Sequence, residues 1–423
     1  MPIKGLFEEF RARGLVHDST DAAALSARLD QGAIGVYVGF DPTADSLHVG
    51  HLMGQLSLRR FQLAGHRPFP LAGGATGMVG DPSGRSDERN LLDRETLEHN
   101  VSCIKSQLEN LLDFTPGPTQ ATLVNNADWT AGITALDFLR DVGKHITVNQ
   151  MMAKESVKNR LNSENGLSYT EFSYMLLQAN DFRHLCATHD VEMQMGGSDQ
   201  WGNITAGIDL IRRTLSRTAF GSTWPLVTKS DGTKFGKTAD GAVWLSAERT
   251  SPYQFRQFWM QMADADVVKY LPQYSLAPLD ELTALAQSHL SDPGKRSAQR
   301  FLAAEMTTIV HGAGAAADAE AAADILFGAD PTGASVDALL TVAAEVPVTK
   351  VSRVDLDDVF GVLARSGIVA STSEARRTIS QSGLKVNGQT LAADESLASK
   401  GFLHDRWVLV RKGKTAYHLF DLA

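Results

Sequence analysis

An apolar stretch that leads into a polar loop and then a helical pattern constrains the fold of this chain more than any other feature. Residues 33–40 are rich in β-branched and aromatic side chains, which predicts a buried strand. Asp41-Pro42 ends it, because proline cannot extend a strand ladder and restricts the residue before it. His48-Val-Gly-His51 then begins a helical pattern, which Gly65 closes as the residue beyond the helix end.

The two histidines of this stretch lie three residues apart, so they share one face of the first helical turn. A helix N-terminus offers unpaired N–H groups and partial positive charge, which makes it a site for anions. Two imidazoles there suit a phosphate whose negative charge grows during a reaction, and Gly50 leaves room for a flat base or ribose. On a surface helix such a pair usually has no function, so it does not define a site alone.

A second strand is predicted over residues 67–72, and a glycine-rich loop follows it up to Gly84. Strand, helix and strand in this order predict a right-handed parallel crossover, and therefore an α/β fold with a doubly wound parallel sheet. The loop does not have the G-x-G-x-x-G spacing of dinucleotide sites. It is expected at the carboxyl edge of the sheet, where Asp81 could bind an ammonium group. Arg85 and Arg89 follow and could contact a polyphosphate, although a solvated loop also explains them.

The alternation continues with a helix over about 93–112, a strand near 121–125 and a helix around 134–141. Residues 143–166 are polar and contain methionines, which is typical of an insertion.

Polar residues form a stripe on the helix predicted from residue 168 to 182. Tyr174, Gln178 and Asp181 stand at i, i+4 and i+7, so a helix places them on one face. Apolar residues flank them at 175, 176, 179 and 182. This pattern predicts a lined pocket, because buried polar groups need partners, while a solvent-facing surface is the alternative.

The next strand, over 191–196, leads into a helix through Asp199 and Gln200, at the edge where parallel sheets bind ligands. Asp199 could also serve as an N-cap. Further on, Lys229-Ser-Asp-Gly-Thr-Lys-Phe-Gly-Lys-Thr238 is not a P-loop, because three residues separate its glycines where the motif needs four. It leads to a strand-like segment over 242–245.

Helical patterns then extend from Ser251-Pro252 to about residue 327, including Ala-rich helices over 280–290 and 292–311. Residues 329–349 are predicted to form a linker region. Two short helices over 356–364 and 373–382, an Asn387-Gly388 hairpin turn and further strand over 407–419 complete the chain.

Charge and cysteine content narrow the function classes. The net charge is −9, but residues 350–423 carry 11 Lys and Arg against 8 Asp and Glu, which leaves 29 against 41 for the rest. A basic terminal module on an acidic body fits local contacts with phosphates, although solvated surface also explains so small an excess. No run of 18 apolar residues suggests a membrane span, and Cys103 and Cys186 suggest neither a disulfide framework nor a zinc site. We expect a cytoplasmic protein.

Several of these segments resemble one family. His48-Val-Gly-His51 resembles the His-Ile-Gly-His motif of class I aminoacyl-tRNA synthetases, and the sequence from Tyr37 to His48 resembles its tyrosyl-tRNA synthetase form. Lys234-Phe-Gly-Lys-Thr238 is similar to the second class motif, Lys-Met-Ser-Lys-Ser, although Phe235 and Gly236 depart from it. Residues 373–379 with Val386-Asn-Gly resemble the S4 RNA-binding module. The resemblance covers essentially the whole chain in the expected order.

The resemblance implies four parts. They are a Rossmann-like catalytic domain over 1–248, a small α-helical domain that contacts the anticodon over 249–328, a linker over 329–350 and an α+β S4-like domain over 351–423. It also implies a homodimer, to which residues 143–166 would contribute. In the S4-like domain Arg376, Arg377 and Lys385 would contact phosphates of tRNA(Tyr).

For tyrosine, the resemblance implies that Tyr37 and Asp181 hydrogen-bond the phenol. Tyr174 and Gln178 would hold the amino group, and Asp81 and Gln200 would complete the site. Phenylalanine would leave a buried carboxylate and a buried phenol unpaired, a discrimination for which this family is itself the standard case.

The resemblance implies that ATP binds with Mg²⁺ as its substrate complex and that the protein itself holds no metal. Thr43 and His48 are assigned to the leaving polyphosphate, and His51 is assigned to the nucleotide. Lys234 and Lys237 would stabilise the charge of the transition state, with Arg85 and Arg89 over the polyphosphate. The remaining expected ATP contacts are Gly39, Asp41, Gly50, Asp199 and Thr238. Two other functions stay open at this point: a tryptophanyl-tRNA synthetase, and a non-catalytic RNA-binding protein on the same scaffold.

Overall fold

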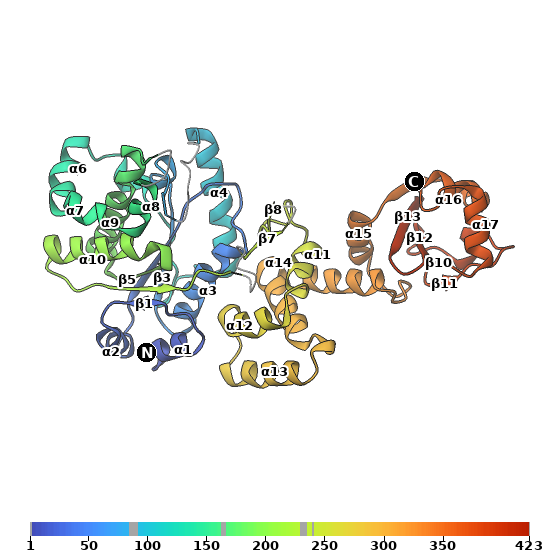
Figure 1. Cartoon of the computed structure of the whole chain (residues 1–423), viewed down its shortest axis with the longest axis horizontal. Helices are drawn as coiled ribbons and strands as arrows, with labels where there is room; N and C mark the ends of the chain where they lie inside the picture. The colour runs from blue at the N-terminus through green and yellow to red at the C-terminus, as the bar shows by residue number, and fades with distance from the viewer. Residues whose placement is uncertain (1, 84–91, 162–165, 229–234, 239–240, 423) are drawn as a thin grey trace. The chain divides into compact units, whose positions relative to one another are not determined.

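The computed structural model describes residues 2–83, 92–161, 166–228, 235–238 and 241–422 (Figure 1). Only the backbone is described for Glu155, Ser156, Asn159, Lys237 and Thr238. The chain divides into two compact units. The first contains residues 1–250 and 260–302, and the second contains residues 251–259 and 303–423.

A six-stranded sheet with the order β1-β6-β5-β2-β3-β4 forms the centre of the first unit. Its strands are β1 Asp18–Ser19, β2 Gly35–Phe40, β3 Arg67–Ala72, β4 Val124–Asn125, β5 Val191–Gly197 and β6 Phe220–Trp224. All neighbouring pairs are parallel except β1 with β6. From β2, the strands β3 and β4 extend the sheet on one side, and β5 and β6 extend it on the other. The doubly wound α/β fold is therefore confirmed, with its switch point between β2 and β5.

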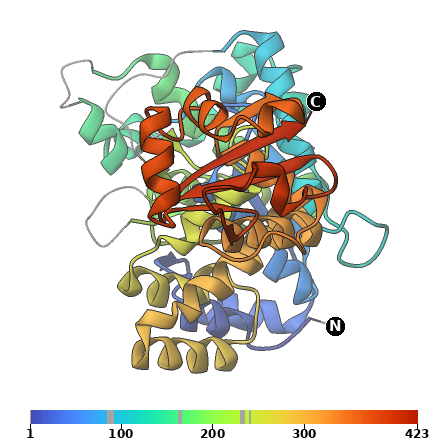
Figure 2. The same cartoon turned by 90° about the vertical axis from the view of Figure 1, so that its right-hand side faces the viewer.

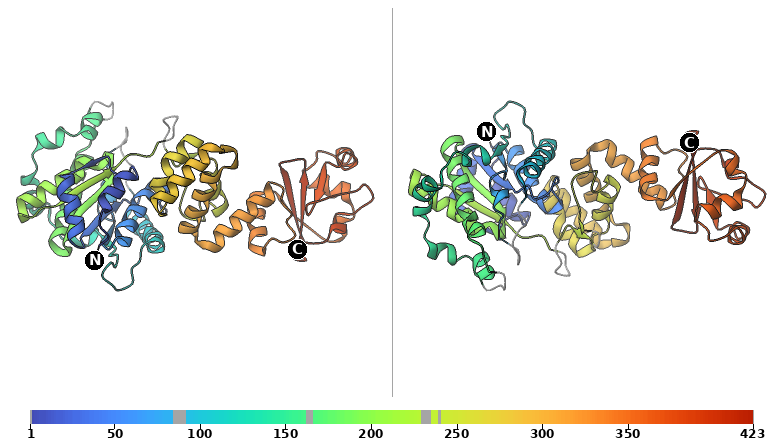
Figure 3. Two further views of the ribbon diagram at one scale, coloured as in Figure 1. Left: turned by 90° about the horizontal axis from the view of Figure 1, so that it is seen from below. Right: turned by 90° about the horizontal axis from the view of Figure 1, so that it is seen from above.

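Helices cover both faces of this sheet (Figures 1 and 3). On one face, α9 Tyr169–His189 and α10 Trp201–Leu215 pack with Tyr37 in a buried cluster. On the other, Gly54 of α3 Val49–Leu63 lies close against Val38, because a Cβ at residue 54 would stand 3.2 Å from the valine Cγ1. Tyr37 and Val38 point to opposite faces, as successive residues of a strand must. The other helices of this part are α1 Leu6–Ala12, α2 Ala22–Gln31, α4 Arg94–Leu111, α5 Ala127–Thr130, α6 Ala135–Asp141, α7 Val148–Met152 and α8 Glu155–Leu161.

The expected strands and helices of this part are confirmed, with two shorter strands. The strand near 121–125 contains only residues 124–125. The strand-like segment at 242–245 is reduced to β8 Gly241–Ala242, which pairs with β7 Lys237–Thr238, while Trp244 forms a single bridge with His48.

The helices after residue 250 belong partly to each unit. They are α11 Pro252–Met260, α12 Asp264–Tyr274, α13 Leu279–Ser291 and α14 Ser297–Leu326. The last has a left-handed φ of 86° at Gly312, just after the predicted helix end at residue 311. Residues 260–302 group with the first unit, so the helices expected as one domain over 249–328 are divided; the family-based domain limits stay a prediction.

Two buried arginines tie α12 to the sheet part of the first unit. Arg13 donates hydrogen bonds to the carbonyl oxygens of Pro272 and Ser275 at 3.1 Å, and Arg60 donates to those of Gln273 and Ser275 at 2.7 Å. Guanidinium groups satisfy carbonyls that a helix C-terminus leaves without intrahelical partners. The position of α12 is therefore fixed by charge-assisted hydrogen bonds.

The second unit contains a five-stranded sheet with the order β11-β10-β12-β13-β9 (Figure 2). Its strands are β9 Val348–Val351, β10 Leu384–Val386, β11 Gln389–Thr390, β12 Trp407–Lys412 and β13 Ala416–Leu422. Val408, Val410 and Phe420 pack with α16 Val359–Arg365 and α17 Thr372–Ser380, while Leu409 and Leu419 pack with α15 Val336–Glu345. Alternation along the strands therefore builds two cores.

The segment expected as a linker over 329–350 is not an unstructured connection. It contains α15, and β9 begins in it and pairs in parallel with β13, about 70 residues later in the chain. The loop-like composition of residues 328–333 led to this expectation, whereas the following residues bury Leu339 and Val342 against the sheet.

Candidate active site

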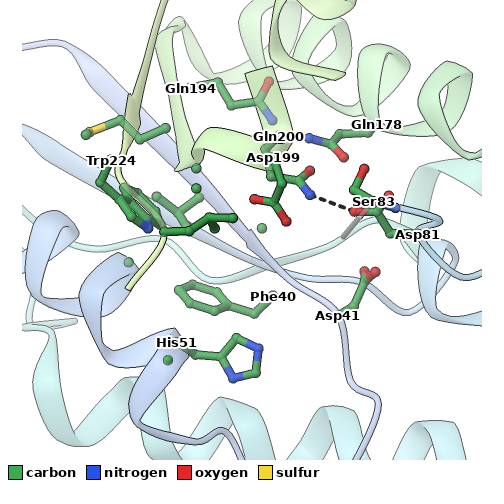
Figure 4. A pocket seen from close by; sticks show the side chains of 18 of the residues that line it. Phe40, Asp41, His51, Asp81, Ser83, Gln178, Gln194, Asp199, Gln200 and Trp224 are labelled. Atoms are coloured by element: carbon green, nitrogen blue, oxygen red, sulfur yellow. Dashed lines mark hydrogen bonds between the residues drawn. The ribbon is translucent and has the colours of Figure 1, made fainter. Parts of the chain in front are cut away.

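A cavity of about 460 Å³ opens at the carboxyl ends of β2 and β5, the edge at which doubly wound sheets bind ligands (Figure 4). Its walls include Tyr37 and Gly39 of β2 and Gln194 and Gly196 of β5. The rest of its lining comes from the loop after β2, the start of α3, β3, the glycine-rich loop, α9, the segment between β5 and α10, β6, and residues after β6. Predicted residues that line it are Asp41, His48, Gly50, His51, Asp81, Tyr174, Gln178, Asp181, Asp199 and Gln200.

Asp181 is the buried carboxylate of the cavity. It accepts hydrogen bonds from Asn126 Nδ2 at 3.0 Å and Trp129 Nε1 at 2.8 Å, and its residue is 1% exposed. Burial raises the pKa of Asp181 from 3.8 to about 7, and Asp41 adds to the rise while the two hydrogen bonds oppose it. The group is therefore partly ionised at neutral pH, and its oxygens can accept a hydrogen bond from a ligand in a position held by two side chains.

Tyr37 brings a phenol to the same end of the cavity. The residue is 2% exposed, and its ring packs against Phe182 with the centroids 6.1 Å apart. Burial raises the pKa of Tyr37 well above its usual value, and the charges of Asp181 and Asp41 raise it further. The phenol thus stays protonated and can both donate and accept a hydrogen bond.

A hydrogen-bonded chain continues from there to the loop after β2. Tyr174 donates its hydroxyl proton to Asp41 at 2.8 Å, and Thr76 donates to the other oxygen of Asp41 at 2.8 Å. Asn126 Nδ2 reaches Thr76 as well as Asp181, both at 3.0 Å. One buried network therefore joins the two carboxylates of this side of the cavity.

A second network lies around Asp81. Gln200 Nε2 donates to Asp81 at 2.7 Å (dashed in Figure 4), and Asn203 Nδ2 lies 3.2 Å from oxygens of both Gln200 and Gln178. The backbone N–H of Ser83 also donates to Asp81, at 2.9 Å. This arrangement presents carboxylate and amide oxygens to the cavity, which suits a ligand ammonium group.

A further acidic group lines the cavity. Asp199 points into it (Figure 4), and burial, followed by the charge of Asp81, raises the pKa of Asp199. Lys154 lies nearby and donates to the carbonyl oxygen of Gly202. Burial lowers the pKa of Lys154 to about 7, while Asp81 opposes that shift.

His48 and His51 stand at the N-terminus of α3 with stacked rings whose centroids are 4.0 Å apart. His48 Nδ1 accepts the N–H of Gly50 at 3.1 Å, and His51 Nδ1 accepts the N–H of His48 at 3.3 Å. Because each Nδ1 is an acceptor, the hydrogen-bond network assigns the proton of each neutral ring to Nε2. Each ring can therefore donate a hydrogen bond from Nε2.

Gly50 also makes room for a neighbouring side chain. A Cβ at residue 50 would lie 2.8 Å from His48 Cε1. The glycine therefore leaves space for the imidazole of His48, and its expected role toward a base or ribose stays a prediction.

The second predicted motif converges on the first. Val49 donates its N–H to the carbonyl oxygen of Val243 at 3.0 Å, and Val243 donates to that of Gly236 at 2.9 Å. Gly236 has a φ of 80°, and a Cβ there would lie 2.5 Å from Val49 Cγ2. Backbone contacts thus place β7, which carries Lys237 and Thr238, next to the helix start that carries the histidines.

Some predicted residues are not placed in the cavity. Thr43 is exposed and does not belong to its lining. Arg85, Arg89 and Lys234 lie outside the described residues, as do the side chains of Lys237 and Thr238.

Sequence reasoning did not single out Thr76, Asn126, Trp129, Lys154 or Asn203. Asn126 and Trp129 follow a strand of only two residues, where no periodic pattern marks a face. Asn203 could have been found, because it lies on the first turn of α10, three residues after Gln200.

The predicted RNA-binding residues lie in the second unit. Arg376 and Arg377 are exposed on α17, and Arg376 stacks over the ring of Phe360 at 4.8 Å. Lys385 is half-buried on β10.

Known proteins match both parts of the chain. The family described as tRNA synthetases class I (W and Y) matches residues 29–328, and the Tyrosine--tRNA ligase SYY-like C-terminal domain matches residues 339–420. No helix in the described part of the chain combines the length and the hydrophobicity that crossing a membrane requires.

Relatives match over nearly the full length. The chain is 50% identical over 417 residues to the tyrosine–tRNA ligase of Opitutus terrae, covering 97% of this chain and 98% of the relative. It is 48% identical over 422 residues to that of Roseiflexus castenholzii, covering 99% of each. The structure of a C-terminally truncated Aspergillus nidulans mitochondrial tyrosyl-tRNA synthetase is similar at 30% identity and a TM-score of 0.70, covering 77% of this chain and 95% of that one. The tryptophan and non-catalytic alternatives are not favoured, and the chain belongs to the class I aminoacyl-tRNA synthetases, among the tyrosine–tRNA ligases.

Proposed function

We propose that the cavity binds tyrosine with its phenol between Tyr37 and Asp181. The observation that carries this proposal is the buried carboxylate of Asp181, held by Asn126 and Trp129 on the same side of the sheet as Tyr37. A phenol gives both groups a further hydrogen bond, whereas a phenyl ring gives them none. A hydrogen bond to a charged group contributes about 1.5–3 kcal/mol, so the pair selects a para-hydroxylated ring.

The ammonium group of tyrosine binds in the second network, at Asp81, Tyr174, Gln178 and Gln200. Asp81 supplies the negative charge, and amide oxygens supply further acceptors. Tyr174 donates to Asp41 in the described structure, so its hydroxyl oxygen accepts from the ammonium group. The tyrosine carboxylate is then directed toward the nucleotide end of the cavity.

ATP occupies that nucleotide end, with contacts from Gly39, Asp41, Gly50, Asp199 and Thr238. His51 contacts the nucleotide, while Thr43 and His48 face the leaving polyphosphate. The Nε2–H groups of the histidines and the N-terminus of α3 offer donors to phosphate oxygens. Arg85 and Arg89 are assigned to the polyphosphate, and Lys234 and Lys237 to the charge of the transition state.

Mg²⁺ enters as part of the substrate, bound to the phosphates of ATP. Mg²⁺ retains several waters and commonly binds through substrate phosphates and one or two carboxylates.

Two reactions follow in this arrangement. A tyrosine carboxylate oxygen attacks the α-phosphorus of ATP in line, the bond from that phosphorus to the bridging β-phosphate oxygen breaks, and pyrophosphate leaves. Tyrosyl-adenylate then transfers its acyl group to a ribose hydroxyl of the terminal adenosine of tRNA(Tyr), and AMP leaves. No covalent enzyme intermediate is needed, because positioning and charge stabilisation are sufficient for phosphoryl transfer of this kind.

The terminal unit contributes to tRNA binding through Arg376, Arg377 and Lys385. The first two are exposed cations on one helix, which suits contacts with phosphates that do not depend on sequence. The proposed domain limits of 249–328 for the anticodon-contacting helices and 351–423 for the S4-like domain follow the family.

We also propose a homodimer in the cytoplasm. Large apolar side chains are exposed on α6 and α7, namely Leu136 at 80%, Leu139 at 51%, Val148 at 62% and Met152 at 40%. Apolar exposure of this kind fits a surface that a second copy covers.

Amino-acid-dependent exchange of labelled pyrophosphate into ATP tests the proposed first step. Tyrosine is expected to support exchange, while tryptophan and phenylalanine leave it near background. Lys237→Ala is expected to depress adenylate formation while tyrosine affinity stays nearly unchanged, because the lysine acts on transition-state charge. An equal loss of tyrosine affinity would refute the lysine assignment, and exchange at background with tyrosine would refute the proposal.

A further inference from the structure

Two residues of the cavity wall, Thr228 and Phe235, flank the part of the second motif that lies outside the described residues. Both line the cavity. The N–H of Phe235 donates to the carbonyl oxygen of Val227 at 3.2 Å, which brings the two ends of the intervening segment together. We call these flanking residues, Val227, Thr228 and Phe235, the stem, and a backbone hydrogen bond joins its two sides.

Tyr270 of α12 contacts both sides of the stem, at Thr228 and at Phe235. Its hydroxyl oxygen accepts the N–H of Thr228 at 3.1 Å, and its hydroxyl proton goes to the carbonyl oxygen of Thr228. Its ring packs against that of Phe235, with the centroids 5.2 Å apart. Tyr270 is 1% exposed and does not line the cavity, so it supports the wall without reaching a ligand.

The support behind this tyrosine is rigid. Lys269 Nζ donates a further hydrogen bond to the Tyr270 hydroxyl at 3.2 Å and lies 4.8 Å from the ring centroid. The phenol therefore has one donated and two accepted hydrogen bonds, its full capacity. The carbonyls that end α12 are in turn held by Arg13 and Arg60. The stem therefore contacts a helix that hydrogen bonds hold against the sheet part of the first unit.

We propose that Tyr270 is a positioning residue for adenylate formation, which holds Thr228 and Phe235 and thereby the strand β7 that follows Phe235 and carries Lys237. This inference rests on the proposed role of Lys237. The hydroxyl holds the N–H and the C=O of one residue, which fixes the orientation of the chain where it enters the segment. A misplacement of about 1 Å at such a point can cost about a hundredfold in rate, although the residue touches no reactant.

The variant Tyr270→Phe removes the hydroxyl and keeps the ring that packs on Phe235. We expect kcat of tyrosine-dependent pyrophosphate exchange to fall about tenfold or more, while the KM for tyrosine and the tyrosine affinity measured by equilibrium dialysis change less than twofold. Tyr417→Phe is the matched control, because its buried hydroxyl also donates to a backbone carbonyl, that of Ile325 at 2.9 Å, in the other unit. The control should leave kcat of exchange unchanged.

The double variant with Lys237→Ala separates this inference from the proposed function. If Tyr270 acts through Lys237, Tyr270→Phe should cost less than about twofold when added to Lys237→Ala. Full activity of Tyr270→Phe beside an impaired Lys237→Ala would overturn the inference alone. Parallel losses of kcat and tyrosine affinity, or additive effects in the double variant, would assign Tyr270 a merely structural role and also overturn it. Full activity of Lys237→Ala would refute the proposed lysine role, and this inference with it.

Discussion

Asn126 donates its side-chain amide to Asp181 at 3.0 Å, at the buried end of the active-site cavity. The same nitrogen reaches Thr76, and the amide oxygen accepts the N–H of Ala75 at 2.7 Å. Asn126 is completely buried, and hydrogen bonds hold both the nitrogen and the oxygen of its side-chain amide. The carboxylate assigned to tyrosine selection is therefore oriented by a residue that has no assigned contact with the substrate.

Replacement of Asn126 by Ala should weaken tyrosine binding. A hydrogen bond to a charged group contributes about 1.5–3 kcal/mol, so we expect the KM for tyrosine to rise about tenfold or more, with a smaller change in kcat. Steady-state pyrophosphate exchange measures both quantities. Asn180→Ala is a suitable control, because Asn180 is also a buried asparagine but bonds Arg183 on the same helix. An unchanged KM in Asn126→Ala would contradict the positioning role.

The raised pKa of Asp181 predicts a pH dependence of stability. Its folded pKa of about 7 exceeds the ordinary value of 3.8, so the folded state binds more protons than the unfolded state between about pH 4 and pH 7. The contribution of this group to the free energy of unfolding therefore decreases as pH rises through that window, by at most about 1.4 kcal/mol per pH unit, and is constant above it. Urea denaturation of the wild type and Asp181→Asn from pH 5 to 8 should show that the stability difference between them decreases as pH rises to about 7 and is constant above it. A constant offset between the two curves would contradict the raised pKa.

Gly236→Ala should move the second motif, at β7, away from the first motif, at the start of α3. A Cβ at residue 236 would lie 2.5 Å from Val49 Cγ2, and the φ of 80° already disfavours any side chain. We expect the rate of adenylate formation to fall about tenfold or more as β7 moves away from α3. Gly241→Ala is the matched control, because its φ of 113° imposes similar strain while a Cβ there has no atom within 4 Å. Equal effects of the two substitutions would show that strain, and not the contact with Val49, causes the loss.

Arg376→Ala and Arg377→Ala should act on tRNA alone. Removal of a phosphate contact weakens nucleic-acid binding at every sequence and reduces the salt dependence of affinity by about one unit of slope for each contact. We expect the KM for tRNA(Tyr) to rise in aminoacylation while pyrophosphate exchange is unchanged. Arg365→Ala provides the comparison, because Arg365 is an exposed arginine of the same unit that pairs with Asp358 at 3.0 Å. A salt slope equal to that of the wild type would contradict phosphate contact by either arginine.

Local sequence signals predicted the elements that build the edge of the sheet. The β-branched run before Asp41 gave β2, and the expected edge for ligands holds the cavity. The stripe of Tyr174, Gln178 and Asp181 was recognisable because helical periodicity places its members on one face. These features depend on residues close together in the chain, where patterns are most informative.

The partners of those residues could not be predicted in the same way. Asn126 and Trp129 meet Asp181 from more than 50 residues away, and only the packing of the chain after β4 against α9 brings them together. The secondary structure within the expected linker has a similar origin, since β9 pairs with β13 about 70 residues later. Contacts between distant segments decide both cases, and no local pattern encodes them.

The ratio of kcat/KM for tyrosine to that for phenylalanine in pyrophosphate exchange, compared between the wild type and Asp181→Asn, tests the central claim most directly. If Asp181 selects the phenol, the variant should lower this ratio about tenfold or more, mainly through its loss of activity with tyrosine. A ratio that stays at the wild-type value would show that other residues make the choice, and would contradict the assignment of Asp181 to substrate selection.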